Sequence, residues 1–169
     1  MSYDQHIAAA SQERARCAIV TLSDTRTEET DTSGKTIRDL LEANGHTVAH
    51  YAILKDDAAL LDEKLLQLLG SPEIDAILTN GGTGISRRDQ AISVIEKHVD
   101  QPLPGFGELF RMLSWEQIGS GAMLSRAVGG IAGGQQIVFA MPGSTKAVEL
   151  AMSKLILPEL KHLLRELRK

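Results

Sequence analysis

Residues 74–84 read Ile-Asp-Ala-Ile-Leu-Thr-Asn-Gly-Gly-Thr-Gly, an apolar run that passes directly into a glycine-rich turn. The apolar half has the length of a buried strand, and glycines allow the backbone conformations that a tight turn needs. A helical pattern with Ile92, Ile95 and Val99 follows the turn. Strand, turn and helix in this order form the repeating unit of an α/β fold.

Two similar strand and helix pairs precede this unit. The alternation predicts an open α/β sheet with right-handed crossovers, in which the strands are mostly parallel. The expected strands are 16–22, 47–54 and 74–79, and the expected helices are about 35–44, 57–69 and 90–98.

The pattern changes after the helix-breaking stretch Pro102-Leu-Pro-Gly. A short helix is expected over 106–115, and Ser114 with Gln117 resembles a capping box for another helix. Phe106, Phe110, Met112 and Trp115 lie in or next to this stretch. They are interpreted either as a satellite core or as part of a subunit contact, because aromatic and methionine residues are enriched at interfaces.

The last third of the chain predicts a hairpin and a long helix. Runs 125–132 and 135–140 flank Gly133 and Gly134, which indicates a two-residue β-hairpin and therefore a mixed sheet. A helix is expected to begin near Ser144 and to kink or restart at Pro158.

Composition limits the possible classes of protein. The 169 residues are 43% hydrophobic and suit one domain, with residues 1–14 expected as a loose segment. A net charge of −4 argues against a nucleic-acid partner, and no apolar stretch is long enough for a membrane span. Cys17 is the only cysteine, which suits the cytoplasm, and the histidine spacings give no reason to expect a structural zinc site.

Two glycine turns, Gly81-Gly-Thr-Gly and Met141-Pro-Gly-Ser-Thr-Lys, follow predicted strands. Ligands of open α/β sheets bind at the carboxyl ends of the strands, and glycine turns let backbone N–H groups approach a phosphate. Neither turn matches the dinucleotide fingerprint or the P-loop. The pair predicts one anion pocket, and a plain tight turn is the alternative for each.

Asp89 and Asp56 follow two of the predicted strands. A bare carboxylate beside phosphate is repulsive, so Mg²⁺ held by both aspartates is one interpretation. The other is that each aspartate caps the helix that follows it. Arg88, next to Arg87, and Lys146 could pair with phosphate or simply face solvent.

Four motifs together resemble the molybdenum cofactor biosynthesis family of MoaB and MogA, with a closer likeness to MoaB. The resemblance covers about residues 15–160. The motifs are Thr79-Asn-Gly-Gly-Thr-Gly-Ile-Ser-Arg-Arg-Asp89, Pro104-Gly-Phe-Gly-Glu-Leu-Phe-Arg111, Ser125-Arg-Ala127 and Met141-Pro-Gly-Ser-Thr-Lys-Ala147.

The resemblance implies a three-layer α/β/α domain with a mixed, mostly parallel sheet, assembled as a trimer or a hexamer. It also implies adenylylation of molybdopterin with ATP and Mg²⁺, which releases pyrophosphate. A non-catalytic pterin-binding or assembly protein of the same pathway is the alternative. This chain departs from the family pattern at Lys55, where a proline is usual, and at Gln90-Ala-Ile-Ser, where Val-Thr-Pro-Glu is common.

Carried over residue by residue, the resemblance makes Asp56 and Asp89 the catalytic and Mg²⁺-binding pair. The positions that it implies for substrate or nucleotide binding are Ser23, Asp24, Gly81, Gly82, Thr83, Gly84, Arg88, Ser125, Arg126, Pro142, Gly143, Ser144 and Lys146.

Overall fold

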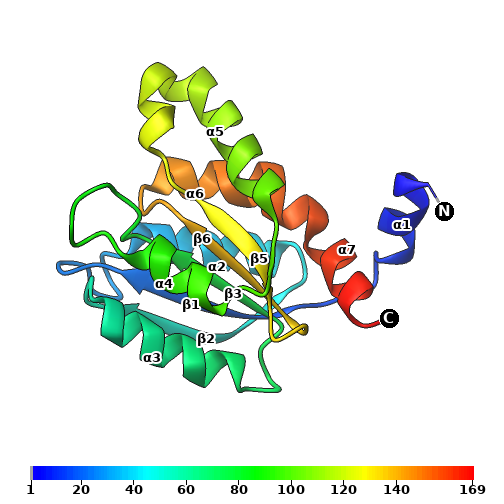
Figure 1. The fold of residues 1–169 in the computed structure, drawn as a ribbon. Coiled ribbons are helices and arrows are strands. Elements are labelled where there is room, and N and C mark those ends of the chain that lie inside the picture. Colours follow the sequence, from blue (N-terminus) through cyan, green and yellow to red (C-terminus); the bar gives the residue numbers. More distant parts are fainter. Residues whose placement is uncertain (1) are drawn as a thin grey trace.

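The computed structural model describes residues 2–169 and contains one six-stranded mixed sheet in the order β2-β1-β3-β6-β5-β4 (Figure 1). The first four strands in this order are parallel, and β5 and β4 run antiparallel to their neighbours. The strands are β1 (Arg16–Leu22), β2 (Thr47–Leu54), β3 (Ala76–Asn80), β4 (Gln101–Pro102), β5 (Val128–Ala132) and β6 (Gln136–Met141). The predicted fold class is confirmed.

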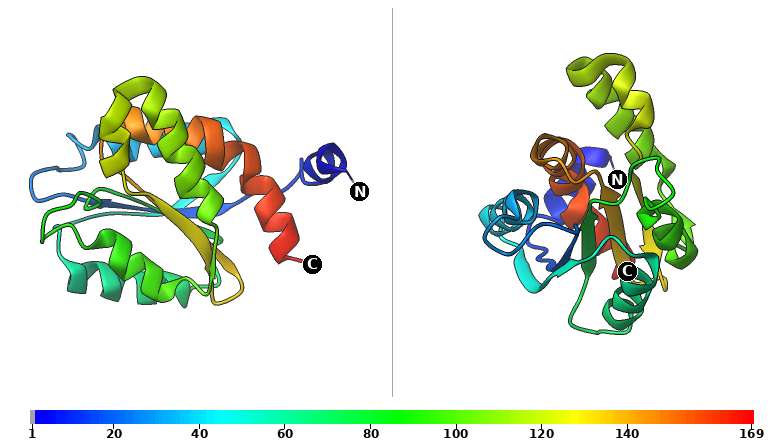
Figure 2. Two further views of the ribbon diagram at one scale, coloured as in Figure 1. Left: turned by 45° about the horizontal axis from the view of Figure 1, so that its top comes forward. Right: turned by 90° about the vertical axis from the view of Figure 1, so that its left-hand side faces the viewer.

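Helices cover both faces of the sheet, which gives three layers (Figures 1 and 2). One apolar core lies between the sheet and α2, α5, α6 and α7, and a second lies between the sheet and α3 and α4. The helices are α1 (Tyr3–Ala9), α2 (Thr32–Ala43), α3 (Ala58–Leu69), α4 (Ala91–His98), α5 (Pro104–Ile118), α6 (Thr145–Ala151) and α7 (Leu157–Leu167).

The hairpin between β5 and β6 has one more loop residue than expected. Ala132 pairs with Gln136, so three residues connect the strands. Gly133 and Gly134 have φ angles of 59° and 67°, as the turn prediction required of them.

The stretch after β4 differs from the prediction of two short helices. α5 is one continuous helix that starts with Pro104 in its first turn, and a 3-10 helix (Gly119–Leu124) follows it. Ser114 caps nothing, because its hydroxyl donates a hydrogen bond to the Phe110 carbonyl inside the helix. The predicted capping box is therefore wrong.

The aromatic residues of α5 divide between its two faces. Phe106 and Phe110 are buried and pack in the core, with the Phe106 ring centroid 4.7 Å from that of Phe139. Met112 and Trp115, in the second half of α5, remain 57% and 62% exposed. The far end of α5 extends away from the body of the molecule (Figures 1 and 2). The core interpretation holds for the phenylalanines alone.

The long C-terminal helix restarts before Pro158, as predicted. α6 is capped by Ser144, whose Oγ accepts a hydrogen bond from the Ala147 N–H. A π-helical segment (Met152–Ile156) then joins α6 to α7, which carries Pro158 in its first turn. The extra residue in the π turn accommodates a proline that cannot donate a backbone hydrogen bond.

The chain before β1, which the sequence analysis expected as a loose segment, contains a helix. Residues Tyr3–Ala9 form α1, which Ser2 and Gln5 cap reciprocally, and α1 lies beside α7 (Figure 1). The capping box at Ser2 and Gln5 was the available signal.

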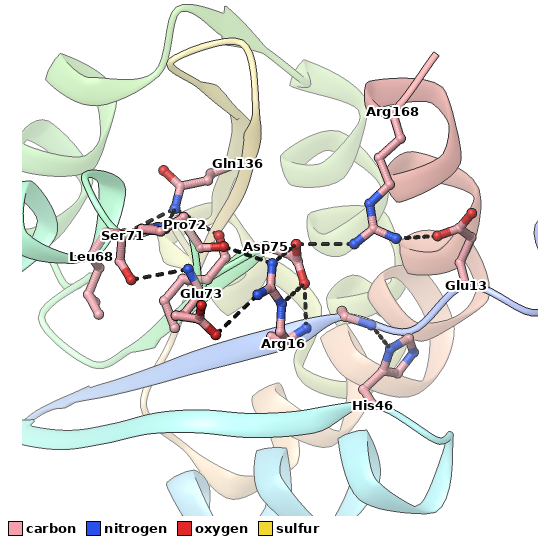
Figure 3. Close-up of polar contacts among 12 residues, drawn as sticks. Glu13, Arg16, His46, Leu68, Ser71, Pro72, Glu73, Asp75, Gln136 and Arg168 are labelled. Carbon is pink, nitrogen blue, oxygen red and sulfur yellow. Dashed lines mark hydrogen bonds and ion pairs between the residues drawn. The ribbon is translucent and has the colours of Figure 1, made fainter.

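Ion pairs tie both ends of the described chain to the amino-terminal edge of the sheet (Figure 3). The Asp75 carboxylate accepts hydrogen bonds from Arg16 and from Arg168, and Arg168 also pairs with Glu13. Burial alone would raise the pKa of Asp75, but the hydrogen bonds from Arg16 outweigh burial and lower it. The candidate site residues lie at the opposite edge, where the parallel strands have their carboxyl ends.

Candidate functional site

The sequence motifs converge on the carboxyl edge of the parallel strands. β1, β2, β3 and β6 end at residues 22, 54, 80 and 141, and the loops that follow them gather at the left-hand edge of the sheet in Figure 1. β5 runs antiparallel, so Ser125 and Arg126, which precede it, arrive at the same edge. Three of the four motifs therefore meet at one end of the sheet, and the fourth, Pro104–Arg111, forms the first half of α5.

The two glycine turns are in direct contact. The Gly81 N–H donates a 3.1 Å hydrogen bond to the Met141 carbonyl. A Cβ atom on Gly143 would lie 3.1 Å from the Gly81 Cα, so a side chain there would push the turns apart. The two turns therefore meet at one edge of the sheet, but the cavity beside the second turn is lined by no residue of the first, so the prediction of one anion pocket is not confirmed.

Glycine is required in the first turn for two physical reasons. Gly81 and Gly82 have φ angles of 94° and 64°, which residues with a side chain rarely adopt. A Cβ on Gly81 would also lie 2.3 Å from the Leu22 carbonyl oxygen, and one on Gly82 would lie 2.8 Å from Asp56 Oδ1. The turn is thus wedged between the end of β1 and a carboxylate.

Asp89 does not cap the helix that follows it. The residue before α4 is Gln90, which makes no side-chain cap hydrogen bond. The Asp89 carboxylate instead turns back and accepts hydrogen bonds from the Ser86 N–H at 2.9 Å and the Ser86 hydroxyl at 2.5 Å. These bonds, led by the hydroxyl, lower the pKa of Asp89, which keeps it ionised. It also lies close to Gly84, where a Cβ would be 2.7 Å from its Oδ2.

Asp56 is also free of a capping role, because Asp57 caps α3 by accepting a hydrogen bond from the Leu60 N–H. Burial raises the pKa of Asp56, and the negative charges of Asp89 and Asp24 raise it further. Asp24 in turn accepts a 3.1 Å hydrogen bond from the Asp56 N–H. Three carboxylates thus lie together beside the first glycine turn.

Arg88 is the cation paired directly within this acidic group. Its guanidinium lies 2.6 Å from Asp24 Oδ2 while the side chain stays 71% exposed. Asp56 and Arg88 line one shallow hollow of about 440 Å³. Ser23 and Asp24 line a neighbouring hollow of about 400 Å³, in which the Ser23 hydroxyl oxygen accepts a hydrogen bond from the Arg26 N–H.

Arg126 binds the backbone of the loop between the first turn and α4. Its guanidinium donates to the carbonyls of Thr83, Gly84 and Asp89. The guanidinium is planar and carries several N–H donors, so it can bind three carbonyl oxygens at once. The structure therefore gives Arg126 a loop-holding contact, where the sequence suggested contact with a substrate.

The second glycine turn opens on the largest cavity described, about 870 Å³, between α5 and α6. Its polar lining residues include Ser125, Ser144 and Lys146. Pro142, Phe110 and Leu150 supply apolar wall. The candidate residues therefore form two groups, a carboxylate cluster by the first turn and a polar cavity by the second.

Sequence reasoning missed the residues that support the second turn. Arg26 donates to the Gly143 carbonyl at 3.0 Å and to Ser33 Oγ at 2.8 Å, and Ser33 donates to the same carbonyl at 2.6 Å. Asp31, fully buried, holds Arg26 and caps α2 through the Gly34 N–H. The Asp-Thr-Ser-Gly run was a cap signal, and it starts α2 at Thr32, three residues before the predicted start.

Comparison with known proteins places this geometry in a family. The family described as "Probable molybdopterin binding domain" matches residues 18–162. Molybdenum cofactor biosynthesis protein B of Bacillus cereus is 52% identical over 170 residues, covering 100% of this chain and 99% of the relative.

Solved structures agree in fold. A crystal structure of molybdenum cofactor biosynthesis protein B has a TM-score of 0.89 at 53% identity and covers 92% of this chain and 97% of its own. The tungsten cofactor synthesizing protein MoaB from Pyrococcus furiosus has a TM-score of 0.82 at 33% identity, covering 93% and 99%. This chain belongs to the molybdenum cofactor biosynthesis family of MoaB, as its motifs indicated.

Proposed function

We propose that this protein binds molybdopterin and transfers AMP from Mg·ATP to its terminal phosphate, releasing pyrophosphate. One observation carries the proposal: Asp56 and Asp89, which the sequence offered as helix caps, cap nothing and lie together against a glycine turn. Carboxylates that are brought together at a cost in repulsion, and that do not cap a helix, are typical of a cation-dependent site.

The donor set fits Mg²⁺. Burial raises the pKa of Asp56, and repulsion by Asp89 and Asp24 raises it further; a divalent cation between the carboxylates would relieve that repulsion. Asp56 and Asp89 would hold the ion. When bound, Mg²⁺ neutralises negative charge on the phosphates of ATP.

The chain's own groups supply positioning. The glycine turns offer backbone N–H groups at the carboxyl edge, where phosphate can approach closely. The cavity beside the second turn has the size of a small-molecule site and supplies hydroxyl groups and Lys146 for a phosphorylated pterin. Arg126 keeps the loop that carries Asp89 against the first turn.

In the reaction, a terminal phosphate oxygen of molybdopterin attacks the α-phosphorus of ATP, and the bond from that phosphorus to the β-phosphate oxygen breaks. Catalysis of this transfer is mainly positioning and charge stabilisation, so it needs no protein nucleophile. The reaction is proposed for the cytoplasm, where the free thiol of Cys17 would remain reduced. Within residues 2–169, no helix combines the length and apolarity that a membrane crossing needs.

The test is adenylyl transfer by purified protein supplied with molybdopterin, ATP and Mg²⁺, read as adenylylated pterin. Asp89→Asn and Asp56→Asn are each expected to lower the rate by roughly 100-fold or more, since loss of a metal-positioning carboxylate removes several kcal/mol of charge stabilisation. Asp39→Asn, an exposed position on α2, is the matched control and should retain wild-type rate.

The same assay separates the alternative. Wild-type protein that binds molybdopterin but forms no adenylylated product would be the non-catalytic pterin-binding or assembly protein. Full activity in both aspartate variants would instead overturn the roles proposed for the carboxylates.

We further propose that the protein works as a homo-oligomer, a trimer or a hexamer. The exposed apolar side chains of α5 support this proposal, because they form a surface of the kind that subunit contacts cover.

A further inference from the structure

Helix α1 is attached to α7 through polar contacts. α1 contributes no buried residue to the core. Tyr3 donates a hydrogen bond to Glu159, Lys161 donates to the Ser11 carbonyl at 3.2 Å, and Arg165 donates to the Ala9 carbonyl. These contacts lie at the opposite end of the molecule from the carboxylate cluster (Figure 1). Something stronger than exposed hydrogen bonds would be needed to fix a seven-residue helix there.

Three potential metal ligands meet where the two helices touch. His6 comes from α1, and His162 and Glu166 are one turn apart on α7. Glu166 Oε1 lies 3.3 Å from His6 Nδ1 and 3.7 Å from His162 Nε2, and one potential ligand atom of each residue lies within 4.8 Å of those of the other two. Metal–ligand bonds of about 2.0–2.2 Å set neighbouring ligands of a tetrahedral site roughly 3.3–3.6 Å apart. A small movement of the two rings would complete that spacing.

The ring of His162 is already oriented for a metal. Its Nδ1 lies 3.0 Å from Glu159 Oε2, which can accept a hydrogen bond from the Nδ1–H, and in that tautomer the lone pair of Nε2 is free to bind a metal. A carboxylate behind a ligating histidine is the usual supporting arrangement in zinc sites. Glu159 is itself held from α1 by Tyr3.

His6 gives a second, independent sign. Its Nδ1 is buried and has no hydrogen-bond partner within residues 2–169, although Glu166 Oε1 is nearby. A buried nitrogen without a partner is unfavourable, and a bound cation would satisfy it.

We propose that His6, His162 and Glu166 bind a divalent transition metal, Zn²⁺ in the first instance, which fastens α1 to α7. Two imidazoles and one carboxylate form the ligand set that zinc accepts with a fourth position left for water. This site is separate from the proposed Mg²⁺ site, because imidazole ligands favour zinc and Mg²⁺ prefers oxygen. The histidine spacings suggested no such site because 156 residues separate His6 from His162.

Lys169 makes the proposal more specific. Its ammonium lies 2.6 Å from Glu166 Oε1, the same oxygen that faces both histidines. A metal ion must therefore displace this lysine, which competes as a monovalent cation. Removing the ammonium group should strengthen metal binding, whereas a purely structural ion pair gives no reason for such a gain.

The experiment uses the full chain without a histidine tag, dialysed against Zn²⁺ in the presence of excess Mg²⁺, which occupies the carboxylate cluster. One equivalent of zinc is expected to remain bound. Co²⁺ used as a probe should give the visible absorption of a four-coordinate site. Amide exchange in residues 3–9 should slow when zinc is added, because the metal holds α1 in place.

Variants assign the ligands. His6→Ala and His162→Ala should each abolish retention of zinc, and Glu159→Gln should weaken binding by about 10–100-fold, as expected for a supporting carboxylate. Lys169→Ala should tighten it. His98→Ala is the matched control, because His98 pairs with Asp62 and should not affect the metal.

Two results would overturn the proposal. One is a wild-type protein that retains less than about a tenth of an equivalent of zinc, far below the full site that a three-ligand protein metal centre binds. The other is retention of zinc by both histidine variants at the wild-type level. Circular dichroism of the metal-free variants checks folding, which the loss of His6 should not disturb, since no residue of α1 belongs to the buried core.

Discussion

At the scale of single residues, an aspartate next to a helix can either cap the helix or bind a cation. Asp57 and Ser144 cap their helices, but Asp56 and Asp89 do not. Sequence alone could not separate Asp56 from Asp57, because both are able to cap α3. The structure separates them by which carboxylate accepts a hydrogen bond from the helix N–H groups, and Asp56 is left beside the glycine turn.

A buried histidine predicts how stability depends on pH. His46 is 3% exposed, and its Nδ1 accepts a 3.0 Å hydrogen bond from the Ala15 N–H. Burial, with the nearby charges of Lys161 and Arg14, lowers its pKa to about 4. In the unfolded chain the His46 imidazole becomes protonated as the pH falls through about 6.5, whereas in the folded protein it stays neutral until about pH 4. The contribution of the neutral His46 to the free energy of unfolding is therefore complete above pH 6.5 and is lost as the pH falls toward 4.

The His46→Asn variant tests this dependence. The asparagine Oδ1 can accept the Ala15 N–H but cannot be protonated in this range. The free energy of unfolding, measured in urea between pH 7 and pH 4.5, should fall less steeply in the variant than in the wild type. The difference should approach about 1.4 kcal/mol per pH unit within the window. Parallel curves for the two proteins would show that His46 does not titrate this way.

At the scale of elements, local sequence patterns predicted the strands correctly but did not locate the first residues of helices that begin with a polar turn. Strands 16–22 and 47–54 match β1 and β2, because apolar runs bounded by polar loops have few alternatives. The first turn of α2 contains no large apolar residue, because Thr32 is exposed and the buried Ser33 and Gly34 are small. The spacing of apolar residues therefore does not reveal where this helix begins.

The supporting roles of Arg26 and Arg126 were beyond sequence reasoning for a different reason, although a motif had already named Arg126 as a binding residue. Arg26 and Gly143 are 117 residues apart, and Arg126 lies 37 residues from Asp89. The glycines and aspartates were found because their neighbours in sequence identify a turn. The arginines act on backbone carbonyls, which every residue has, so no pattern of side chains marks the contact.

The Arg126→Lys variant tests the loop-holding role. Lysine keeps the charge but cannot bridge the carbonyls of Thr83, Gly84 and Asp89 as one planar fork. Amide exchange in residues 83–89 should become at least several-fold faster. The free energy of unfolding should fall by about 1–2 kcal/mol, the typical worth of lost charge-assisted hydrogen bonds. Arg111→Lys on α5 serves as control, and unchanged exchange in the Arg126 variant would refute the role.

At the scale of the whole molecule, α5 leaves more large apolar side chains exposed than any other helix among residues 2–169. Its buried side anchors it through Phe106 and Phe110, and its other side leaves large apolar side chains in solvent. The exposed residues of α5 and the 3-10 helix after it are Leu109, Met112, Trp115, Ile118, Met123 and Leu124. Soluble proteins rarely expose an apolar surface of this kind unless another molecule binds to it.

Substitution of Trp115 by glutamate is therefore expected to dissociate the proposed homo-oligomer, because a charge in a desolvated contact between copies is costly. Phe110 is the wrong site for this test: it is 1% exposed, and a charge there would unfold the core. Leu66→Glu is the matched control, since Leu66 on α3 is exposed to a similar degree, 59% against 62% for Trp115. Light scattering should give a mass of three or six chains for wild type and control, and 18.3 kDa for Trp115→Glu with its circular dichroism unchanged. A monomeric wild type would refute the proposed homo-oligomer, and an intact oligomer in Trp115→Glu would show that the subunit contact lies on another face.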